Sequence, residues 1–110
     1  MILGIGLDIE EKSRIQIATE NEYLLFQKLS DRDGEFRESN FVILEALYKA
    51  MGCPASIDWT EIEIYRQNGK PQILMFGSML QEFPDMLFHV SVSHSDGYIC
   101  AVVIIESNPD

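Results

Sequence analysis

One pattern limits the folds open to this chain more than any other. Apolar residues recur at helical spacing over residues 39–51, and the pattern ends at Gly52, closely followed by Pro54. Ser39 has the side chain of a helix N-cap, and glycine followed by proline is typical of a helix end. The pattern predicts a helix over 39–51, whose apolar side must be buried against another element.

Most of the remaining segments are typical of strands. In the apolar start of the chain, Gly4 and Gly6 predict a strand that another backbone or a ligand approaches closely. Asn68-Gly69 is a strong hairpin signal. The expected strands are 2–9, 59–66, 71–76, 88–93 and 98–105, with one or two short helices over 11–29, another over 78–82, and a frayed tail over 107–110. This order predicts one α+β domain over residues 1–110, a small antiparallel sheet with the long helix packed on it.

Charge and hydropathy argue against several function classes. The chain has 18 acidic and 8 basic residues, a formal net charge of −10, so neither nucleic acid nor an anionic membrane surface is an expected partner. The sequence contains no bilayer-length apolar stretch and no basic signal-peptide region. Cys53 and Cys100 make no disulfide framework, and Cys100 is expected to be a small core residue. A cytoplasmic protein is expected, and 110 residues bury only a modest core, which favours oligomerisation.

Three segments carry a family resemblance by their order and content. They are Gly4-Ile5-Gly6-Leu7-Asp8-Ile9-Glu10-Glu11 with Arg14-Ile15, the helical stretch 41–52, and the stretch that holds Gly69-Lys70-Pro71, Ser91-Val92-Ser93-His94 and residues 101–106. Together they resemble the phosphopantetheinyl transferase family, in its short-chain branch, the holo-acyl-carrier-protein synthases. That family has a strand ending in Gly-x-Asp and a helix close to Phe-Ala-Ala-Lys-Glu-Ala-x-x-Lys-Ala-Leu-Gly.

The resemblance implies an activity and a set of partners. The implied enzyme moves 4′-phosphopantetheine from coenzyme A to a serine of an acyl carrier protein and releases adenosine 3′,5′-bisphosphate. The resemblance also implies Mg²⁺ dependence, a homotrimer with active sites between subunits, and a role in fatty acid biosynthesis. Two carboxylates would accept Mn²⁺ as well as Mg²⁺. The residues identify neither the carrier protein nor whether the donor is coenzyme A or an acylated form of it.

Carboxylates are the candidate metal ligands. Attack of a serine on a diphosphate is catalysed mainly by neutralising phosphate charge, and Mg²⁺ takes one or two carboxylates together with phosphates and water. By resemblance, Asp8 and Glu45 hold the metal and Glu45 is catalytic, which requires the helix to cross near the strand end. Glu10 is a third candidate, because Asp8-x-Glu10 matches longer members of the family. The alternative is that Asp8 caps the next helix while Glu10 and Glu45 are solvated.

Four residues are candidates for binding the phosphates of coenzyme A. Lys49 lies one helical turn after Glu45, so it is either a catalytic phosphate contact or the partner in an i,i+4 ion pair. Lys70 in the Gly-Lys-Pro turn, and Ser93 and His94 in the Ser-x-Ser-His motif, are cofactor-binding positions by resemblance. The alternatives are an ordinary hairpin lysine and a structural histidine.

Two basic residues near the start are candidates for docking the carrier protein. Lys12 and Arg14 follow the first strand, and Arg14 fits the family's Arg-Ile position. Carrier proteins present an acidic recognition helix, which basic side chains complement. The alternative is an exposed helix face. His89 matches nothing catalytic and is expected to be structural.

Two positions depart from the family pattern. Leu44 stands where the family has a lysine before the catalytic glutamate, and Asn40 stands where it often has an arginine. Loss of a cation beside the reacting phosphates weakens stabilisation of the transition state. The stretch between Ile15 and Glu45 is also shorter than expected, and the acidic chain differs from the basic face that an acidic carrier favours.

These departures leave three hypotheses open. The first is an active transferase that compensates with Lys49, Arg37 or Arg32. The second is a non-catalytic relative that acts as a binding or assembly subunit. The third is an unrelated α+β domain with chance motif matches, which close approach of Asp8 and Glu45 would argue against.

Overall fold

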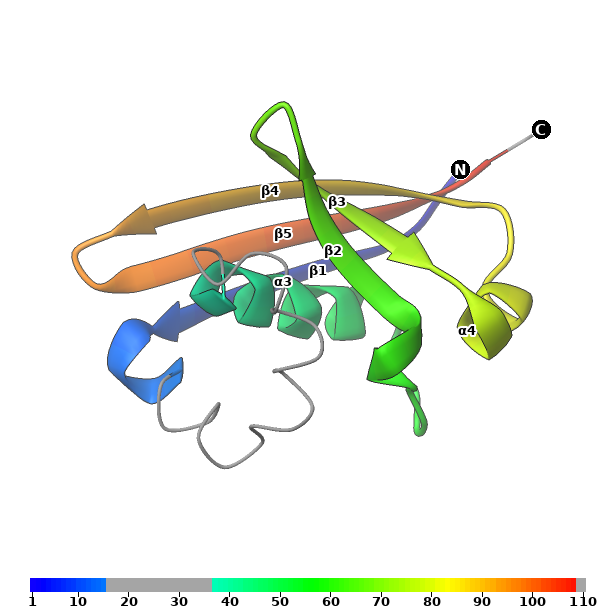
Figure 1. Ribbon diagram of the computed structural model, residues 1–110, viewed down its shortest axis with the longest axis horizontal. Helices are drawn as coiled ribbons and strands as arrows, with labels where there is room; N and C mark the ends of the chain where they lie inside the picture. The colour runs from blue at the N-terminus through cyan, green and yellow to red at the C-terminus, as the bar shows by residue number, and fades with distance from the viewer. Residues whose placement is uncertain (16–36, 109–110) are drawn as a thin grey trace.

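The computed structural model describes residues 1–15 and 37–108 (Figure 1). Its elements are β1 (Ile2–Glu11), α3 (Arg37–Ala50), the 3-10 turn η2 (Trp59–Glu61), β2 (Ile62–Gln67), β3 (Lys70–Met75), α4 (Gly77–Glu82), β4 (Met86–Ser95) and β5 (Tyr98–Ser107). An antiparallel sheet has the strand order β1-β5-β4, and β2 and β3 form a separate hairpin. This arrangement confirms the predicted α+β class with the long helix packed on a small sheet.

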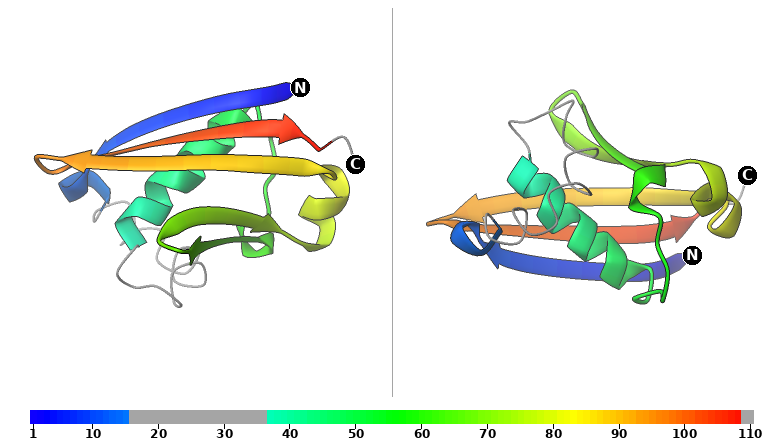
Figure 2. Two further views of the ribbon diagram at one scale, coloured as in Figure 1. Left: turned by 90° about the horizontal axis from the view of Figure 1, so that it is seen from above. Right: turned by 60° about the horizontal axis from the view of Figure 1, so that its bottom comes forward.

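The helix α3 lies directly on the strand β1 (Figure 2). A Cβ atom on Gly4 would lie 1.9 Å from the carbonyl oxygen of Ala50, and one on Gly6 would lie 1.8 Å from that of Ala46. No side chain fits at such distances, so the two glycines allow the helix backbone to touch the strand. The predicted close approach at Gly4 and Gly6 is confirmed, and the approaching group is α3.

The ends of α3 test two expectations. At its C-terminal end, Gly52 has φ +82°, its N–H donates to the Lys49 carbonyl at 3.0 Å, and the Cys53 N–H donates to the Tyr48 carbonyl at 3.0 Å. The predicted stop at Gly52 is therefore confirmed. The predicted N-cap is wrong, because Ser39 lies inside the helix. Of the helical segment expected over 11–29, residues 12–15 are helical and the rest lies outside the described residues.

The hairpin β2–β3 forms as its turn sequence predicts. Asn68 and Gly69 have φ values of +52° and +78°, and Gln67 pairs with Lys70 across the turn. Two successive residues with positive φ make the turn whose twist matches that of a hairpin. Ile62, Ile64, Ile73 and Met75 are buried in the core shared with α3 and β5. The hairpin therefore covers the same face of the sheet as α3.

Several predicted strand boundaries need correction. The strand expected from 59 begins at Ile62, because the Asp58 side chain accepts a hydrogen bond from the Thr60 N–H at 3.0 Å and turns the chain into η2. β4 extends beyond the predicted 88–93 at both of its ends. β5 begins at Tyr98 as predicted and extends two residues beyond the predicted end at 105. Ser107, predicted to be frayed, pairs with Met86, and its N–H donates to the Met1 carbonyl at 2.9 Å. Residues 109–110 lie outside the described residues.

The two faces of the three-stranded sheet differ sharply. Ile99, Ala101, Val103 and Ile105 of β5 are buried beneath α3. On the opposite face, Leu3, Ile5, Leu7 and Ile9 of β1 have exposed fractions of 49–63%. We call this second surface, formed by these four residues with Cys100, Val102 and Ile104 of β5, the open face. Cys100 is half-buried there, which corrects its predicted place in the core.

Within the described residues, the structure contains no helix of the length and apolar character needed to cross a membrane.

Candidate functional site

An ion pair between strand and helix forms the centre of the candidate site. Asp8 follows Gly4 and Gly6 on the face of β1 that meets α3, and only 6% of it is exposed. Lys49 Nζ lies 2.9 Å from Asp8 Oδ1 and 3.1 Å from the Leu7 carbonyl oxygen. The hydrogen bond to Asp8 is the main cause that raises the pKa of Lys49. Asp8 and Lys49 are 41 residues apart, so the contact of α3 with β1 creates this pair.

Two further carboxylates act on the same lysine. Besides Asp8, the charges of Glu45 and Glu10 raise the pKa of Lys49. The pKa of Glu10 is itself raised, first because burial removes water from the carboxylate and then because Asp8 is a neighbouring negative charge. The structure therefore gathers Asp8, Glu10, Glu45 and Lys49 into one cluster, from β1 and α3. The predicted crossing of the helix near the strand end is present.

The cluster suits a hydrated divalent cation. Asp8 Oδ2 is buried, and within the described part of the chain it has no hydrogen-bond partner. A buried carboxylate oxygen without a partner is costly unless a cation or a donor reaches it. No group of three or more His, Cys, Asp or Glu among the described residues could hold a metal alone. Mg²⁺ needs only one or two carboxylates when substrate phosphates and water complete its shell, so the donor set fits Mg²⁺.

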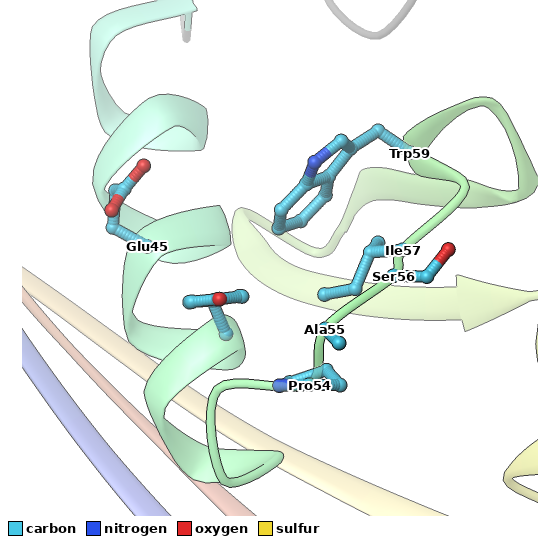
Figure 3. Close-up of a pocket in the computed structure, with 7 residues that line it drawn as sticks. Glu45, Pro54, Ala55, Ser56, Ile57 and Trp59 are labelled. Atoms are coloured by element: carbon cyan, nitrogen blue, oxygen red, sulfur yellow. The ribbon is translucent and has the colours of Figure 1, made fainter.

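A pocket of about 490 Å³ opens beside Glu45. Figure 3 shows Glu45 on α3 and, across the space, Pro54, Ile57 and Trp59 of the segment that follows the helix. The rings of Tyr48 and Trp59, both in the lining, have centroids 6.3 Å apart. The sequence interpretation missed this pocket. Tyr48 stands three residues after Glu45, a spacing that places both on one side of a helix. This spacing was the signal in the sequence that the two residues line one surface.

A second groove, of about 540 Å³, lies between the β2–β3 hairpin and β4. We call it the basic groove, because its lining includes Arg66, Lys70 and His94; the other lining residues are Ser39, Gly69, Pro71, Val90, Ser91 and Val92. The predicted pair Lys70 and His94 therefore shares one groove. Ser93 is not among the residues that line it. Ser93 instead lines a small hollow of about 120 Å³ with Ile9 and Cys100, and His94 lines this hollow as well as the groove.

The remaining candidates lie at the end of β1, next to the cluster, or have structural partners. Arg14 is exposed and its Nε lies 3.9 Å from Glu11 Oε2, while the Lys12 N–H donates to the Gly97 carbonyl at 2.8 Å. Their place at the end of β1 is compatible with docking and does not test it. His89 Nε2 lies 3.1 Å from Glu106 Oε1 of the neighbouring strand, as expected for a structural histidine.

The two departures from the family pattern have different surroundings. Leu44 has an exposed fraction of 3% and belongs to the hydrophobic core, so it does not line either cavity. Asn40, also 3% exposed, accepts a hydrogen bond at Oδ1 from Arg66 Nη1 at 2.9 Å. Arg66 was not among the residues singled out from the sequence. Of the two arginines suggested as replacements, Arg37 is the first residue of α3 and Arg32 lies outside the described residues.

Known proteins match this chain over nearly its whole length. The family model of the 4′-phosphopantetheinyl transferase superfamily matches residues 4–103. The holo-[acyl-carrier-protein] synthase of Anoxybacillus flavithermus is 40% identical and that of Streptomyces coelicolor 32%; each alignment covers 96% of this chain, and 97% and 98% of the relatives. Each reported relative carries the name of an enzyme, so none supports the non-catalytic hypothesis.

Solved structures agree with these matches. The holo-(acyl-carrier-protein) synthase of Bacillus anthracis in complex with CoA (3′,5′-ADP) is 30% identical, with a TM-score of 0.69 over 97% of this chain and 98% of that chain. The synthase of Neisseria meningitidis has a TM-score of 0.77 at 23% identity, over 97% of this chain and 100% of that chain, which shows the shared fold. Chance motif matches on an unrelated domain are thereby excluded.

Proposed function

The chain belongs to the 4′-phosphopantetheinyl transferase superfamily, and we propose that it is a holo-[acyl-carrier-protein] synthase, which transfers 4′-phosphopantetheine from coenzyme A to a serine of an acyl carrier protein. The observation that carries the proposal is the cluster of Asp8, Glu45 and Lys49, joined by the packing of α3 on β1. Full-length similarity to synthases, one of them in complex with CoA, supports the same activity.

The reaction exchanges one phosphoester bond for another. The serine oxygen of the carrier attacks the phosphorus that bears pantetheine, the bond from that phosphorus to the bridging diphosphate oxygen breaks, and adenosine 3′,5′-bisphosphate leaves. Lys49 brings a positive charge to the diphosphate oxygens. Glu45 accepts the serine proton, because it is a carboxylate in the lining of the pocket beside the cluster. The cluster thus supplies charge neutralisation and a proton acceptor.

Mg²⁺ would be held by Asp8 and Glu45, with Glu10 as a third candidate. A bound divalent cation supplies further neutralisation of phosphate charge. Asp8 Oδ2, which is buried and has no hydrogen-bond partner among the described residues, and the raised pKa of Glu10 support a cation at this place. Lys49 holds the other oxygen of Asp8, which orients the carboxylate.

Coenzyme A would lie along both cavities. The pocket beside Glu45 is lined by polar groups, among them Tyr48 and Ser56, and by the ring of Trp59, which suit the uncharged, amide-bearing pantetheine arm. The basic groove, with Lys70 and His94, suits the phosphorylated nucleoside end. Ser93 does not line the groove but lines the small hollow on the other side of His94, so it would contribute to donor binding only where the donor reaches that hollow.

The carrier protein would dock at the end of β1. Arg14 is exposed there, and Lys12 follows Glu11 on the same short helical segment. Two basic residues beside the cluster complement an acidic carrier helix. A homotrimer would cover the open face, since four exposed aliphatic side chains on one strand are typical of a subunit interface. A cytoplasmic location and a role in fatty acid biosynthesis remain predictions.

A carrier-labelling assay tests the activity. The purified chain is incubated with coenzyme A, Mg²⁺ and several apo acyl carrier proteins, and the mass of each carrier is measured. We expect one added phosphopantetheine group on the carrier serine. Asp8→Asn should lower the rate by about a hundredfold or more, because it removes the charge at the centre of the cluster.

A matched control separates chemistry from folding. Asp85→Asn makes the same substitution in the turn before β4, at a φ of +56° that asparagine also adopts. This variant should retain full labelling. Absence of labelling by the folded wild-type chain with every carrier tested would overturn the proposed function.

A further inference from the structure

Lys49 contacts the same aspartate that we assign to the metal. Its Nζ lies 2.9 Å from Asp8 Oδ1 and 3.1 Å from the Leu7 carbonyl oxygen, so two of the three N–H bonds of the ammonium are directed to β1. The two partners differ in exposure: 48% of the lysine side chain is exposed, against 7% of the aspartate side chain. The lysine can therefore leave the contact toward solvent, whereas the buried aspartate cannot.

The same contact opposes a cation at Asp8. Asp8 Oδ2 is buried and has no hydrogen-bond partner within the described residues, and a divalent cation there would share one carboxylate with the lysine ammonium. Two positive charges on one carboxylate repel each other. The described residues also contain no group of three or more His, Cys, Asp or Glu that could hold a metal alone. With Lys49 on Asp8, the cluster is therefore a weak site for a metal ion by itself.

A diphosphate beside the cluster changes this balance. Its negative charge attracts the ammonium, and its oxygens are ligands that Mg²⁺ takes together with one or two carboxylates. Lysine is a point charge on a flexible four-carbon stem, so it can turn from one anionic partner to another without a change in the backbone. Glu45, one helical turn before Lys49, lines the pocket that we assign to the pantetheine arm. The diphosphate attached to that arm would therefore lie within reach of the lysine.

We propose that Lys49 exchanges Asp8 for the diphosphate of the donor, and that this exchange couples metal binding to donor binding. The inference rests on the proposed function, because it takes coenzyme A as the donor and Asp8 as a metal ligand. Before the donor binds, the lysine holds Asp8 and disfavours the metal. With the donor in place, it neutralises phosphate charge and leaves Asp8 to the metal. By thermodynamic linkage, the donor tightens metal binding by the same factor by which the metal tightens donor binding.

Titration with Mn²⁺ tests the exchange without any turnover. Free Mn²⁺ gives an electron paramagnetic resonance signal that is lost on binding, so bound metal is measured directly, and no carrier protein is present. Wild type should bind Mn²⁺ weakly alone and about tenfold or more tightly with saturating coenzyme A, a factor within the range of coupling between two sites. A titration of coenzyme A with Mn²⁺ but no protein gives the background to subtract.

Lys49→Met removes the ammonium and keeps most of the side-chain length. It should bind Mn²⁺ alone about fivefold more tightly than wild type, a modest factor because the lysine is half exposed, and coenzyme A should tighten this binding by less than in wild type. Lys49→Arg, which keeps the positive charge, should resemble wild type. Lys12→Met is the matched control, because it removes one positive charge from an exposed lysine just after β1, and it should leave both Mn²⁺ affinities at wild-type values.

The outcomes separate this inference from the proposed function. Equal Mn²⁺ affinity of wild type and folded Lys49→Met without coenzyme A, or equal tightening by coenzyme A in both, would overturn the exchange, while carrier labelling by wild type would leave the transferase activity standing. Coupling of Mn²⁺ to coenzyme A without labelling of any carrier would overturn the transferase activity and leave the exchange in place. If Lys49→Met fails to fold, as judged by its thermal unfolding, Lys49→Gln provides the same comparison.

Discussion

Asp8 illustrates at the scale of one residue how a site forms around a buried charge. Its carboxylate is taken out of water where β1 meets α3, and one of its oxygens is paired with Lys49 while the other has no partner in the described residues. Burying a carboxylate is costly unless its charge is balanced. Lys49 balances it in the absence of a metal, so the stability of this region depends on the charge of the lysine.

The pKa of Lys49 gives this dependence a direction. Because the folded chain raises the pKa of Lys49 above its usual value, the lysine contributes stability at neutral pH and loses that contribution as pH rises through its folded pKa. Lys49→Met should therefore be less stable than wild type at about pH 8, and the pH-dependent part of the difference should be lost only as pH rises above the usual lysine pKa and through the raised pKa of the folded chain. Since half of the Lys49 side chain is exposed, water screens its interaction with Asp8. The pH-dependent part of the stability difference should therefore be about 1 kcal/mol.

Urea unfolding of both proteins across this pH range measures the difference. Other lysines and tyrosines titrate equally in wild type and variant, so they cancel when the two are compared. A stability difference that stays constant to high pH would contradict the assigned role of the lysine charge.

At the scale of elements, α3 joins the core and the site. Ala46 and Ala50 are one turn apart and bring the helix backbone against Gly6 and Gly4. Glu45 and Lys49 occupy the neighbouring row of the same helix, again one turn apart. Close packing of the first row on β1 therefore delivers the second row to Asp8. The glycines of β1 set the distance at which the ion pair can form.

Gly6→Ala tests this coupling. Its Cβ would lie 1.8 Å from the Ala46 carbonyl oxygen, which is part of the helix backbone and cannot rotate away. The helix must shift, at a cost of about 3 kcal/mol of unfolding free energy, and Lys49 should move away from Asp8. Thermal unfolding and carrier labelling should both decline.

Gly69→Ala is the matched control for this change. The turn glycine has φ +78° and open space around its Cβ position, so alanine there costs only about 1 kcal/mol. Equal destabilisation by the two substitutions would show that helix–strand contact at Gly6 is not the limiting feature.

At the scale of the whole molecule, the open face is expected to be covered by another subunit. Leu3, Ile5, Leu7 and Ile9 are each about half exposed or more, side by side on an edge strand of the sheet. Apolar surface of this kind is stabilised when a second copy covers it. A chain with net charge −10 repels its own copies, so apolar contact over the open face must outweigh this repulsion if the copies assemble.

Ile5→Glu should break the assembly. It places a negative charge in the middle of the open face. Burying this unpaired carboxylate in an interface would cost roughly several kcal/mol. Light scattering coupled to size exclusion should give a trimer mass for wild type and a monomer mass for the variant. Leu80→Glu, at a leucine on α4 that is 49% exposed and lies outside this face, is the control and should stay trimeric. A monomeric wild type would contradict the predicted homotrimer.

The sequence by itself determined the features that depend on local backbone preference and on motif order. Gly52 ends the helix and Asn68-Gly69 closes the hairpin because few other residues adopt positive φ without strain. The order of the motifs around Asp8, Glu45 and Lys70 was enough to identify the family, because such an ordered set seldom recurs by chance.

Tertiary structure alone decided which side chains meet. Ser39 is a residue type typical of an N-cap but lies inside α3, and Ser93 shares a motif with His94 but does not line the groove that His94 lines. Arg66 was not predicted because its partner Asn40 is 26 residues away, and only the packing of the hairpin beside α3 brings the two within 2.9 Å. Contacts between distant residues depend on how the elements pack, and packing is not encoded in the spacing of any one segment.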